Sequence, residues 1–479
     1  MREFFERLLR QAAVAGVQPA VVSPQGEFSY SALIERVRGH AQWARRLPRR
    51  VGLLFANGPD HVVCDLALSF AGKELVPLPE FFSDAQLLHV VQAAQLSHAV
   101  ADSVSAERAT RLGLTVHQLA AESLTNIAPA SDAGRIIFTS GTTGKPKGVC
   151  LSGRQLLASV AALAQATGAS AADRYLSVLP NSLLLEQIAG TYLPLYVGAA
   201  IHIPAAALAA SPGSRLAIAA EQTRATATVL VPELLMAWVK ELQTLGRPAP
   251  GSLRFIAVGG APVSRRLATA AWQQGLPVYE GYGLSECSSV VSVNRPDARR
   301  AGTVGRPLSN VQVAIDGGEI VVGGPTVMDG YVSEPKISGS WRTGDLGHFD
   351  PDGFLIVTGR KDNVIVTDAG RNINPEWIEE IIAADSRVRR CVIVGHEREL
   401  VALIIPSDTS ICSDFPAMRD LVTFAARGLP DYAKPRRYLA MSDEEFRRLD
   451  LLTANSRPRR CEVSQIVTER SRSLHVQGA

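Results

Sequence analysis

The amino-acid sequence predicts an α/β fold, in which a large N-terminal domain of mostly parallel sheets with flanking helices precedes a small α+β domain. Three observations predict it. Short apolar runs alternate with amphipathic stretches through the first half of the chain, as strands and helices do around parallel sheets. From about residue 303, hairpin-like segments replace this alternation. The length of 479 residues also exceeds what one hydrophobic core usually organises.

The strand–helix alternation is most regular in two stretches of the N-terminal part. Strands are expected where apolar residues are continuous, and helices where they recur at every third or fourth position. Parallel strands covered on both faces are fully buried, which agrees with the apolar character of these runs. The expected strands are 50–58, 74–80, 227–233 and 253–263, and the helices expected to follow them are 60–73, 84–95, 234–246 and 264–275.

The C-terminal part has the pattern of an α+β domain. Asp-Gly pairs at Asp316 and Asp352 predict tight turns, because this dipeptide is typical of hairpins. The expected elements are hairpins at 311–324 and 347–360, a helix at 374–384 and two strands within 389–406. We therefore divide the chain into a large domain of residues 1–361 and a small domain of residues 362–479.

Composition and charge argue against several classes of function. Apolar residues make up 46% of the chain and charged residues 20%, which is ordinary for a globular protein. The net charge of +3 gives no reason to expect a nucleic-acid surface. The six cysteines form no CxxC pair and have no histidine at zinc-binding spacing, so we expect reduced thiols and a cytoplasmic protein.

Neither the N-terminus nor the longest uncharged stretch predicts a membrane segment. The first residues alternate charge with apolar side chains at helical spacing, without the uncharged core of a signal peptide. Residues 188–210 carry no Asp, Glu, Lys or Arg, but Pro194, Gly198 and Pro204 interrupt them. A helix, a strand and an Ala-rich helix are expected there rather than one span.

The stretch "IFTSGTTGKPKG" (137–148) combines three glycines, four hydroxyls and two lysines. Such loops bind phosphates, because backbone N–H groups and an ammonium group converge on the oxygens. In this stretch Gly141 and Gly144 are only three apart, and Pro146 stands where a P-loop has the hydroxyl that binds magnesium. A P-loop hydrolase or kinase is therefore nearly excluded, whereas a loop with solvated lysines remains an alternative.

The same stretch resembles the phosphate loop of the adenylate-forming superfamily, which comprises acyl- and aryl-CoA synthetases, peptide-synthetase adenylation domains and luciferases. Three further segments resemble family motifs in the family's order: "YEGYGLSE" (279–286) its adenine and magnesium segment, "WRTGDLGHFDPDGFLIVTGRKDNVI" (341–365) its ribose segment and hinge, and "AGRNINPEWIEEII" (369–382) the start of its mobile C-terminal domain. The resemblance extends from about residue 25 to about residue 465 and is closest in character to fatty acyl-CoA synthetases.

The resemblance implies ATP, Mg²⁺ and a thiol acceptor, either CoA or phosphopantetheine. It places Lys147 at the β- and γ-phosphates and makes Glu286 the magnesium ligand, a hard oxygen donor for a hard cation. Asp345 would bind both ribose hydroxyls with help from Arg360, and the small domain would rotate about Asp362. The other residues that the resemblance places around the nucleotide are Thr139, Ser140, Gly141, Thr142, Thr143, Gly144, Gly260, Ala261, Tyr282, Gly283 and Ser285.

Two positions depart from the family pattern. In the acyl segment "LPNSLLLEQIAGTYLPLYVGA" (179–199), Leu183 replaces the usual His or aromatic residue. The leucine row 183–185 lines an apolar acyl or aryl pocket in one interpretation and is ordinary core in the other. In "TANSRPRR" (453–460), Arg457 occupies the position of the family's catalytic lysine. Arg keeps the charge but is a planar fork, so this replacement is not conservative.

These features predict an ATP-dependent carboxylate ligase with Lys147, Glu286 and Arg457 as catalytic residues. It would convert a fatty or aryl acid to an acyl adenylate, release pyrophosphate, and transfer the acyl group to the thiol of CoA or of a carrier protein. The departure at Arg457 leaves an alternative open, namely a protein that binds nucleotide and acyl adenylate but adenylates slowly. In a further interpretation, the residues after Ser456 are only a solvated basic tail.

Overall fold

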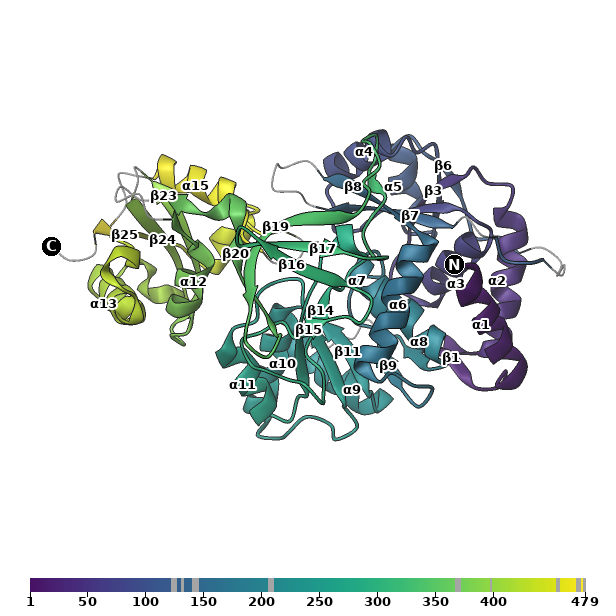
Figure 1. Ribbon diagram of the computed structural model, residues 1–479, viewed down its shortest axis with the longest axis horizontal. Coiled ribbons are helices and arrows are strands. Elements are labelled where there is room, and N and C mark those ends of the chain that lie inside the picture. Colours follow the sequence, from purple (N-terminus) through teal and green to yellow (C-terminus); the bar gives the residue numbers. More distant parts are fainter. Residues whose placement is uncertain are drawn as a thin grey trace. The chain divides into compact units, whose positions relative to one another are not determined.

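The computed structural model describes residues 1–121, 127–130, 133–139, 146–205, 211–366, 372–396, 399–453, 457–470 and 475–476 (Figure 1). The chain divides into two compact units. Unit 1 consists of Met1–Val263, Leu267–Val313 and Val322–Trp341, and unit 2 consists of Ser264–Arg266, Ala314–Val321 and Arg342–Ala479.

Unit 1 contains two large sheets, and most of their strands pair in parallel. In the nine-stranded sheet, antiparallel pairing is confined to the two edges. Its strand order is β15 (Arg306–Pro307), β14 (Ser292–Val293), β13 (Val278–Tyr282), β12 (Phe255–Val258), β11 (Ala227–Leu230), β9 (Arg174–Leu176), β10 (Ala200–His202), β1 (Pro19–Ser23) and β2 (Gly26–Ser29).

The second sheet of unit 1 has seven strands and carries the predicted phosphate loop at one side. Five neighbouring strands are parallel, and β8 joins them through an antiparallel hairpin with β7. The strand order is β18 (Gly330–Tyr331), β8 (Lys147–Ser152), β7 (Gly134–Thr139), β4 (Glu74–Pro77), β3 (Arg50–Leu54), β5 (His98–Ala101) and β6 (Thr115–His117).

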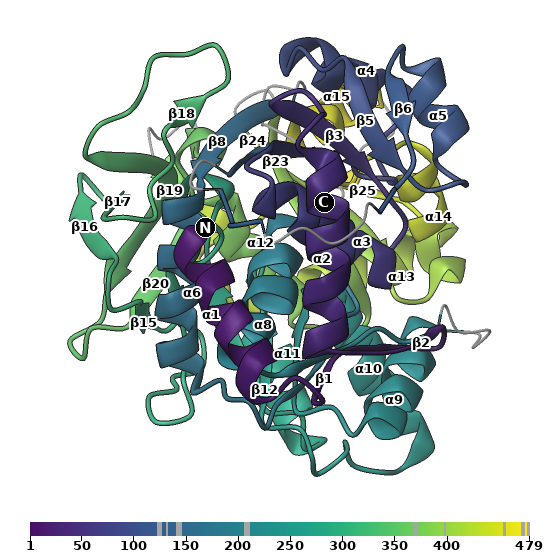
Figure 2. The same ribbon diagram turned by 90° about the vertical axis from the view of Figure 1, so that its right-hand side faces the viewer.

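Helices pack against both sheets, and Figure 2 shows α1 lying beside α2. Apolar residues on one face of α1, among them Phe4, Phe5 and Leu8, are buried. Ser83 caps α4 in a capping box with Gln86, which explains where that helix begins. The helices of this part are α1 (Arg2–Val14), α2 (Tyr30–Ala44), α3 (Pro59–Phe70), α4 (Asp84–Ala93), α5 (Ala106–Arg111), α6 (Gly153–Thr167), α7 (Leu184–Glu186), α8 (Leu193–Val197), α9 (Pro212–Thr223), α10 (Pro232–Leu245) and α11 (Arg265–Gln273).

The uncharged stretch 188–210 is divided among several elements. The π-helix η1 (Gln187–Tyr192) leads into α8, which ends at Gly198 in the left-handed conformation, and β10 follows. The Ala-rich helix expected after β10 falls mainly on residues outside the described part of the chain. Among the described residues, no helix combines the length and apolarity that crossing a membrane requires.

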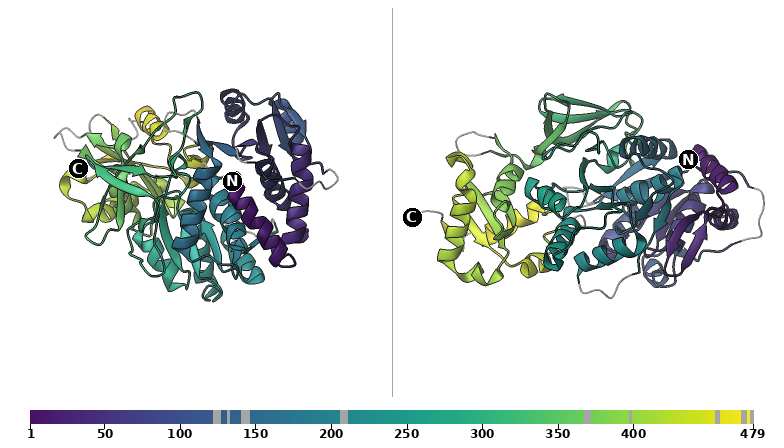
Figure 3. Two further views of the ribbon diagram at one scale, coloured as in Figure 1. Left: turned by 45° about the vertical axis from the view of Figure 1, so that its right-hand side comes forward. Right: turned by 90° about the horizontal axis from the view of Figure 1, so that it is seen from below.

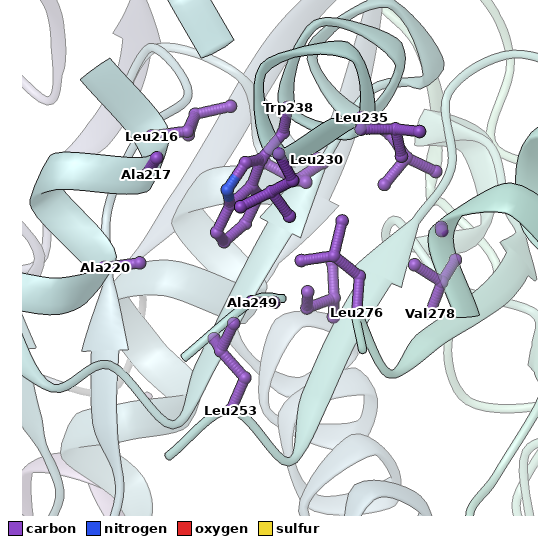
Figure 4. Packing of buried hydrophobic residues seen from close by; sticks show 14 of the residues in the cluster. Leu216, Ala217, Ala220, Leu230, Leu235, Trp238, Ala249, Leu253, Leu276 and Val278 are labelled. Atoms are coloured by element: carbon purple, nitrogen blue, oxygen red, sulfur yellow. The ribbon is translucent and has the colours of Figure 1, made fainter. Parts of the chain in front are cut away.

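One hydrophobic core of unit 1 lies beneath α9 and α10 (Figure 4). The indole of Trp238 is fully buried among leucines of neighbouring segments, including Leu230 of β11 and Leu276 between α11 and β13. Burial of such a side chain stabilises the fold by roughly 1.5–3 kcal/mol. These contacts fix the positions of β12 and β13, whose carboxyl ends carry the two predicted adenine segments.

In unit 2, a four-stranded sheet lies between two pairs of helices, in the green-to-yellow part of Figure 3. Alternate residues of its central strand β24 enter two different cores, as expected for a strand that is covered on both faces. Leu400, Ala402 and Ile404 pack with α12 and α13, whereas Val401 and Leu403 pack with α14 and α15. The order is β23 (Val388–His396), β24 (Glu399–Pro406), β25 (Arg437–Ala440) and β26 (His475–Val476), with α12 (Pro375–Ala383), α13 (Phe415–Ala425), α14 (Asp443–Arg448) and α15 (Arg460–Glu469).

A second four-stranded sheet carries the predicted ribose and hinge segments. Its two hairpins are the predicted ones, with Gly317 and Gly318 in the first turn at positive φ and Gly353 in the second. The strand order is β16 (Gln312–Asp316), β17 (Glu319–Gly323), β19 (Ser340–Phe349) and β20 (Leu355–Arg360). The short strands β21 (Ile365–Val366) and β22 (Asn372–Ile373) form a separate pair. The predicted α/β fold with a small α+β C-terminal part is confirmed.

Candidate active site

The predicted phosphate loop joins β7 to β8. Thr139 and Lys147 face each other as the last pair of this hairpin. The predicted residues Ser140, Gly141, Thr142, Thr143 and Gly144 lie outside the described part of the chain. At the C-terminal end of the loop, Nε2 of His89 in α4 donates to the carbonyl oxygen of Pro146 at 3.0 Å. The hairpin and His89 therefore hold both ends of the loop.

Lys147 and Glu286 are brought together with a tyrosine that the sequence reasoning missed. The hydroxyl of Tyr331 donates to Glu286 Oε1 at 2.8 Å. The ammonium group of Lys147 lies over the ring of the same tyrosine, 5.0 Å from its centroid. Two oppositely charged residues predicted to be catalytic thus contact one aromatic side chain. In the sequence, Tyr331 is part of a Gly-Tyr pair shortly after Gly324 and Pro325. Such a pair is too common to predict a residue of the site.

The turn that carries Glu286 has a tightly packed backbone. A Cβ atom on Gly283 would lie 1.6 Å from the carbonyl oxygen of Ser289, so only glycine fits there. Ser288 and Ser289 both have positive φ values, of 55° and 88°, which is uncommon for residues other than glycine. Ser288 Oγ donates to the carbonyl oxygen of Thr326 at 2.7 Å. These contacts fix the short 3₁₀ helix η2 (Ser285–Cys287), which includes the predicted residue Ser285.

The two predicted adenine segments follow neighbouring parallel strands. β12 and β13 pair in register from Ile256 to Val258 with Val278 to Glu280, so Gly260 and Tyr282 lie at the same edge of the sheet. The site of a missing Cβ on Gly259 is 3.4 Å from the carbonyl oxygen of Gly281, and Gly260 has a φ of +82°. Carboxyl ends of parallel strands are the usual place for nucleotide sites in open α/β sheets. Ala261 directly follows Gly260 in this loop.

Asp345, Arg360 and Asp362 form a second group, in unit 2. Asp345 and Arg360 are partners in the register of β19 and β20, and Arg360 Nη1 lies 3.0 Å from Asp345 Oδ1. Arg360 Nη2 lies 3.7 Å from Asp362 Oδ2, in the 3₁₀ helix η3 (Lys361–Asn363). The predicted ribose and hinge residues are therefore side-chain neighbours.

Glu319 of β17 supports this second group and was also missed from the sequence. One carboxylate oxygen accepts from the backbone N–H of Gly344 at 3.1 Å, and the other accepts from Arg342 at 2.8 Å and from Lys361 at 3.3 Å. The Glu319 side chain is only 6% exposed. Burial alone would raise its pKa, but the donated hydrogen bonds outweigh burial, so the pKa is lowered.

The leucine row of the predicted acyl segment divides between core and partial exposure. Leu184 is buried, whereas Leu183 and Leu185 are half-buried. Directly after them, the carboxyl group of Glu186 is fully buried, and it accepts from Ser177 Oγ at 2.6 Å and from the Tyr175 hydroxyl at 2.9 Å. Burial raises the pKa of Glu186 to about 8.

A buried ion pair stands close to the same segment. Arg135 of β7 and Asp65 of α3 form two hydrogen bonds of 2.6 Å, and the hydroxyl of Tyr192 donates to Asp65 at 2.6 Å. Gln187 Oε1 accepts a further bond from Arg135 at 3.0 Å. Because Gln187 and Tyr192 delimit η1, the network ties the π-helix of the acyl segment to the strand that leads into the phosphate loop.

Arg457 lies in a small hairpin of unit 2. Thr453 and Arg457 exchange two hydrogen bonds, from Thr453 N to Arg457 O at 2.8 Å and from Arg457 N to Thr453 Oγ1 at 3.1 Å. The Arg457 side chain is exposed, as a mobile catalytic group or a solvated arginine would be. By contrast, Arg460 Nη1 donates to Oε1 of Glu379 in α12 at 2.5 Å. The residues after Arg457 therefore do not form a solvated tail.

Comparisons with known proteins fit this geometry. The family model described as AMP-binding enzyme matches residues 8–332, and the model of the AMP-binding enzyme C-terminal domain matches residues 362–423. The chain belongs to the AMP-binding enzyme family. It is an AMP-forming acid–thiol ligase by class, as the sequence predicted.

Several relatives of this AMP-binding enzyme carry the same description. A 2-succinylbenzoate–CoA ligase of Bacillus cereus is 29% identical over 458 residues, covering 88% of this chain and 89% of that protein. A second Bacillus cereus ligase of this description is 30% identical over 384 residues, covering 72% and 75%. The predicted closeness to fatty acyl-CoA synthetases, and with it a role in fatty acid metabolism, finds no support among the relatives compared.

Two solved structures share the fold of the enzyme. The o-succinylbenzoate CoA synthetase of Bacillus subtilis, solved with its acyl-adenylate intermediate, has a TM-score of 0.82 and 22% identity, covering 95% of this chain and 97% of that one. An anthranilate CoA ligase in complex with anthranoyl-AMP has a TM-score of 0.85 and 16% identity, covering 97% and 96%. At these identities the likeness concerns the fold.

Proposed function

We propose that the enzyme activates an aromatic carboxylic acid with ATP and transfers the acyl group to CoA. An oxygen of the acid would attack the α-phosphorus of ATP, and the bond to the β-phosphate would break, giving acyl-AMP and pyrophosphate. The CoA thiolate would then attack the acyl carbon, AMP would leave with the bond's electrons, and the thiol proton would pass to solvent. The aromatic preference rests on relatives that are named for 2-succinylbenzoate.

The observation that carries the proposal is the group of Lys147, Tyr331 and Glu286 beside the phosphate hairpin. Adenylation brings one anion onto another, so neutralisation and alignment of charge dominate its catalysis. Lys147 would bind the departing phosphates, together with the hydroxyl of Thr139 and residues 140–144. Glu286 fits Mg²⁺, because its carboxylate is half-buried and Tyr331 occupies only Oε1. When bound, the metal would supply further positive charge at the phosphates.

The remaining residues would bind the nucleoside and separate the two half-reactions. Tyr282 would stack on adenine opposite Gly260 and Ala261. Asp345 would bind the ribose hydroxyls with Arg360 beside it. We retain the division into residues 1–361 and 362–479, with rotation of the small domain about Asp362 after adenylation, because family hinges of this kind expose the thiol path. Arg457 would approach the carboxylate and α-phosphate during adenylation.

Cofactors and location follow from the same proposal. CoA is the acceptor that we favour, and a carrier-protein phosphopantetheine is the second choice because it presents the same thiol arm. All six cysteines are free thiols, which agrees with a cytoplasmic protein. An adenylation-impaired protein that binds acyl adenylate is the second candidate function, and the observation in its favour is Arg457 at the position of the lysine.

The test is pyrophosphate release in the presence of hydroxylamine, which traps acyl adenylates as hydroxamates. The panel of acids should include 2-succinylbenzoate, anthranilate, benzoate and fatty acids of several lengths. We expect an aromatic acid to give the highest kcat/KM. Turnover with fatty acids alone would contradict the aromatic preference. Bound ATP without turnover on any acid would contradict the ligase and favour the second candidate.

A further inference from the structure

Tyr331 is placed by backbone pairing with the strand that carries Lys147. β18 pairs antiparallel with β8, and Tyr331 faces Val149 in the register. The backbone N–H of Val332 donates to the carbonyl oxygen of Gly148 at 2.8 Å. A Cβ atom on Gly148 would lie 2.8 Å from the Val332 side chain, so the missing side chain lets the two strands approach. The position of Tyr331 is thereby tied to the end of the phosphate hairpin.

The tyrosine ring is also fixed from the side. Trp341 packs edge-on against it, with 5.8 Å between ring centroids and 81° between ring planes. Edge-to-face aromatic pairs of this kind are stabilising beyond the area that they bury. The ring is consequently held in one orientation, with its face towards Lys147 and its hydroxyl on Glu286.

Lys147 and Glu286 have opposite charges and contact the same tyrosine, one at its ring face and the other at its hydroxyl. In the part of the chain that the structure describes, they form no ion pair with each other. A direct pair would neutralise both groups and compete with the anion and cation that each of them is proposed to bind. A cation is attracted to the face of an aromatic ring, and a hydrogen bond to a charged group is stronger than one between neutral groups. Both contacts are strong enough to orient the side chains.

We propose that Tyr331 is a positioning residue that keeps Lys147 and Glu286 oriented and apart for their roles in adenylation. The inference rests on the proposed function. The hydroxyl fixes Oε1 of Glu286 and leaves Oε2 for a divalent cation. The ring face orients the Lys147 ammonium group. Because an aromatic ring carries no net charge, the positive charge of Lys147 stays available for phosphate. One side chain therefore prepares both halves of the phosphate site before ATP arrives.

The two contacts can be separated by substitution. Tyr331→Phe removes the hydroxyl and keeps the ring, whereas Tyr331→Leu removes both. Phe28 offers a matched control for Tyr331→Leu, because the Arg36 guanidinium lies over its ring at 4.2 Å from the centroid and Phe28 lies on the edge strand β2, outside the proposed site. Phe28→Leu should leave ATP binding unchanged.

Each variant requires two measurements. The first is ATP affinity, measured by calorimetry in EDTA. The second is the Mg²⁺ concentration that gives half-maximal pyrophosphate release. For Tyr331→Phe we expect unchanged ATP affinity in EDTA and a three- to tenfold higher Mg²⁺ requirement. For Tyr331→Leu we expect, in addition, about tenfold weaker ATP affinity in EDTA. In a Glu286→Gln background, Tyr331→Phe should have no further effect on the affinity of the protein for MgATP.

Equal losses in both measurements for Tyr331→Phe, or no loss in either, would overturn the inference. A lowered melting temperature with an unchanged Mg²⁺ requirement would assign Tyr331 a purely structural role and would overturn it as well. Failure of the proposed function looks different, because wild-type protein would then give no pyrophosphate release with any acid. Tyr331→Phe keeps the aromatic ring and removes only the hydroxyl. It therefore tests the inference even if Tyr331→Leu does not fold.

Discussion

The carboxyl group of Glu186 has no exposed surface and no cationic partner among its hydrogen bonds to Ser177 and Tyr175. Its environment favours the neutral acid, with a pKa of about 8. The residue follows the leucine row of the acyl segment directly and precedes the π-helix η1. Insertions of this kind within helices are frequent at functional sites. Glu186 is therefore a buried, neutral side chain within the predicted acyl segment at neutral pH.

We predict that Glu186→Gln removes a pH dependence of stability. In the unfolded chain Glu186 ionises near its ordinary pKa of 4.5, whereas in the folded protein it keeps its proton up to about pH 8. The folded state then binds more protons between these values, so stability falls as pH rises through this window, by at most about 1.4 kcal/mol per pH unit. Urea unfolding of both proteins from pH 5 to 8 measures the difference.

The outcome that would contradict this account is parallel pH dependence in wild type and Glu186→Gln. A suitable control is Glu3→Gln, since Glu3 is an exposed residue of α1. Its substitution should leave the slope of stability against pH unchanged.

At Arg457, we predict that Arg457→Lys accelerates adenylation. The hairpin backbone at Thr453 remains the same, and lysine restores a compact, strongly hydrated charge at the position where the family carries one. We expect pyrophosphate release about tenfold faster, which corresponds to about 1.4 kcal/mol of transition-state stabilisation. Arg448→Lys is the control, because Arg448 is 72% exposed and lies 4.0 Å from its nearest acid. An unchanged or slower rate would mean that Arg457 already serves as the working residue or that another cation does.

Among the elements, β17 has the clearest supporting role, because its first residue Glu319 binds groups from β19 and η3. Gly344 precedes the predicted ribose residue Asp345, and Lys361 precedes the predicted hinge residue Asp362. One buried carboxylate thus joins the turn that would bind the nucleoside to the start of the hinge.

We predict that Glu319→Gln weakens ATP binding about three- to tenfold. The amide keeps one oxygen that can accept from Gly344 but loses the negative charge that pairs with Arg342 and Lys361. Hydrogen bonds to a charged acceptor are stronger than those to a neutral one, and among the described residues Arg342 keeps only Asp316 as an ion-pair partner. Calorimetric titration with ATP measures the affinity, and thermal unfolding reports stability. Glu469→Gln is the matched control, since Glu469 is exposed at the end of α15. Unchanged ATP affinity in a fully folded Glu319→Gln variant would show that Glu319 does not support nucleotide binding.

The sequence predicted most elements, because their signals are local. Apolar residues at helical spacing predicted α4, and Asp-Gly pairs marked the turns of both hairpins. Continuous burial along β24, with alternate residues in two cores, follows from an apolar run in a sheet covered on both faces. Tyr331 and Glu319 could not be predicted, because their contacts join residues far apart in the chain: 45 positions separate Tyr331 from Glu286, and 42 separate Glu319 from Lys361. Nothing in the local sequence encodes such pairings.

At the scale of the whole molecule, two units suit a reaction of two steps. Adenylation requires that water is excluded while phosphate charge is neutralised, whereas thiol transfer requires an open path to the adenylate. The proposed rotation about Asp362 would provide one arrangement of the chain for each step. Unit 1 contains the residues proposed to bind phosphate and adenine, and unit 2 contains those proposed to bind ribose, together with Asp362 and Arg457.

The most direct test is to identify the nucleotide product together with the acyl product. The enzyme should be incubated with ATP, Mg²⁺, CoA and the best acid of the panel, and AMP, ADP, pyrophosphate and acyl-CoA quantified by chromatography and mass spectrometry. The account predicts AMP, pyrophosphate and acyl-CoA in equal amounts, and accumulation of acyl-AMP when CoA is omitted. Formation of ADP and phosphate, or acyl-CoA without AMP, would contradict it.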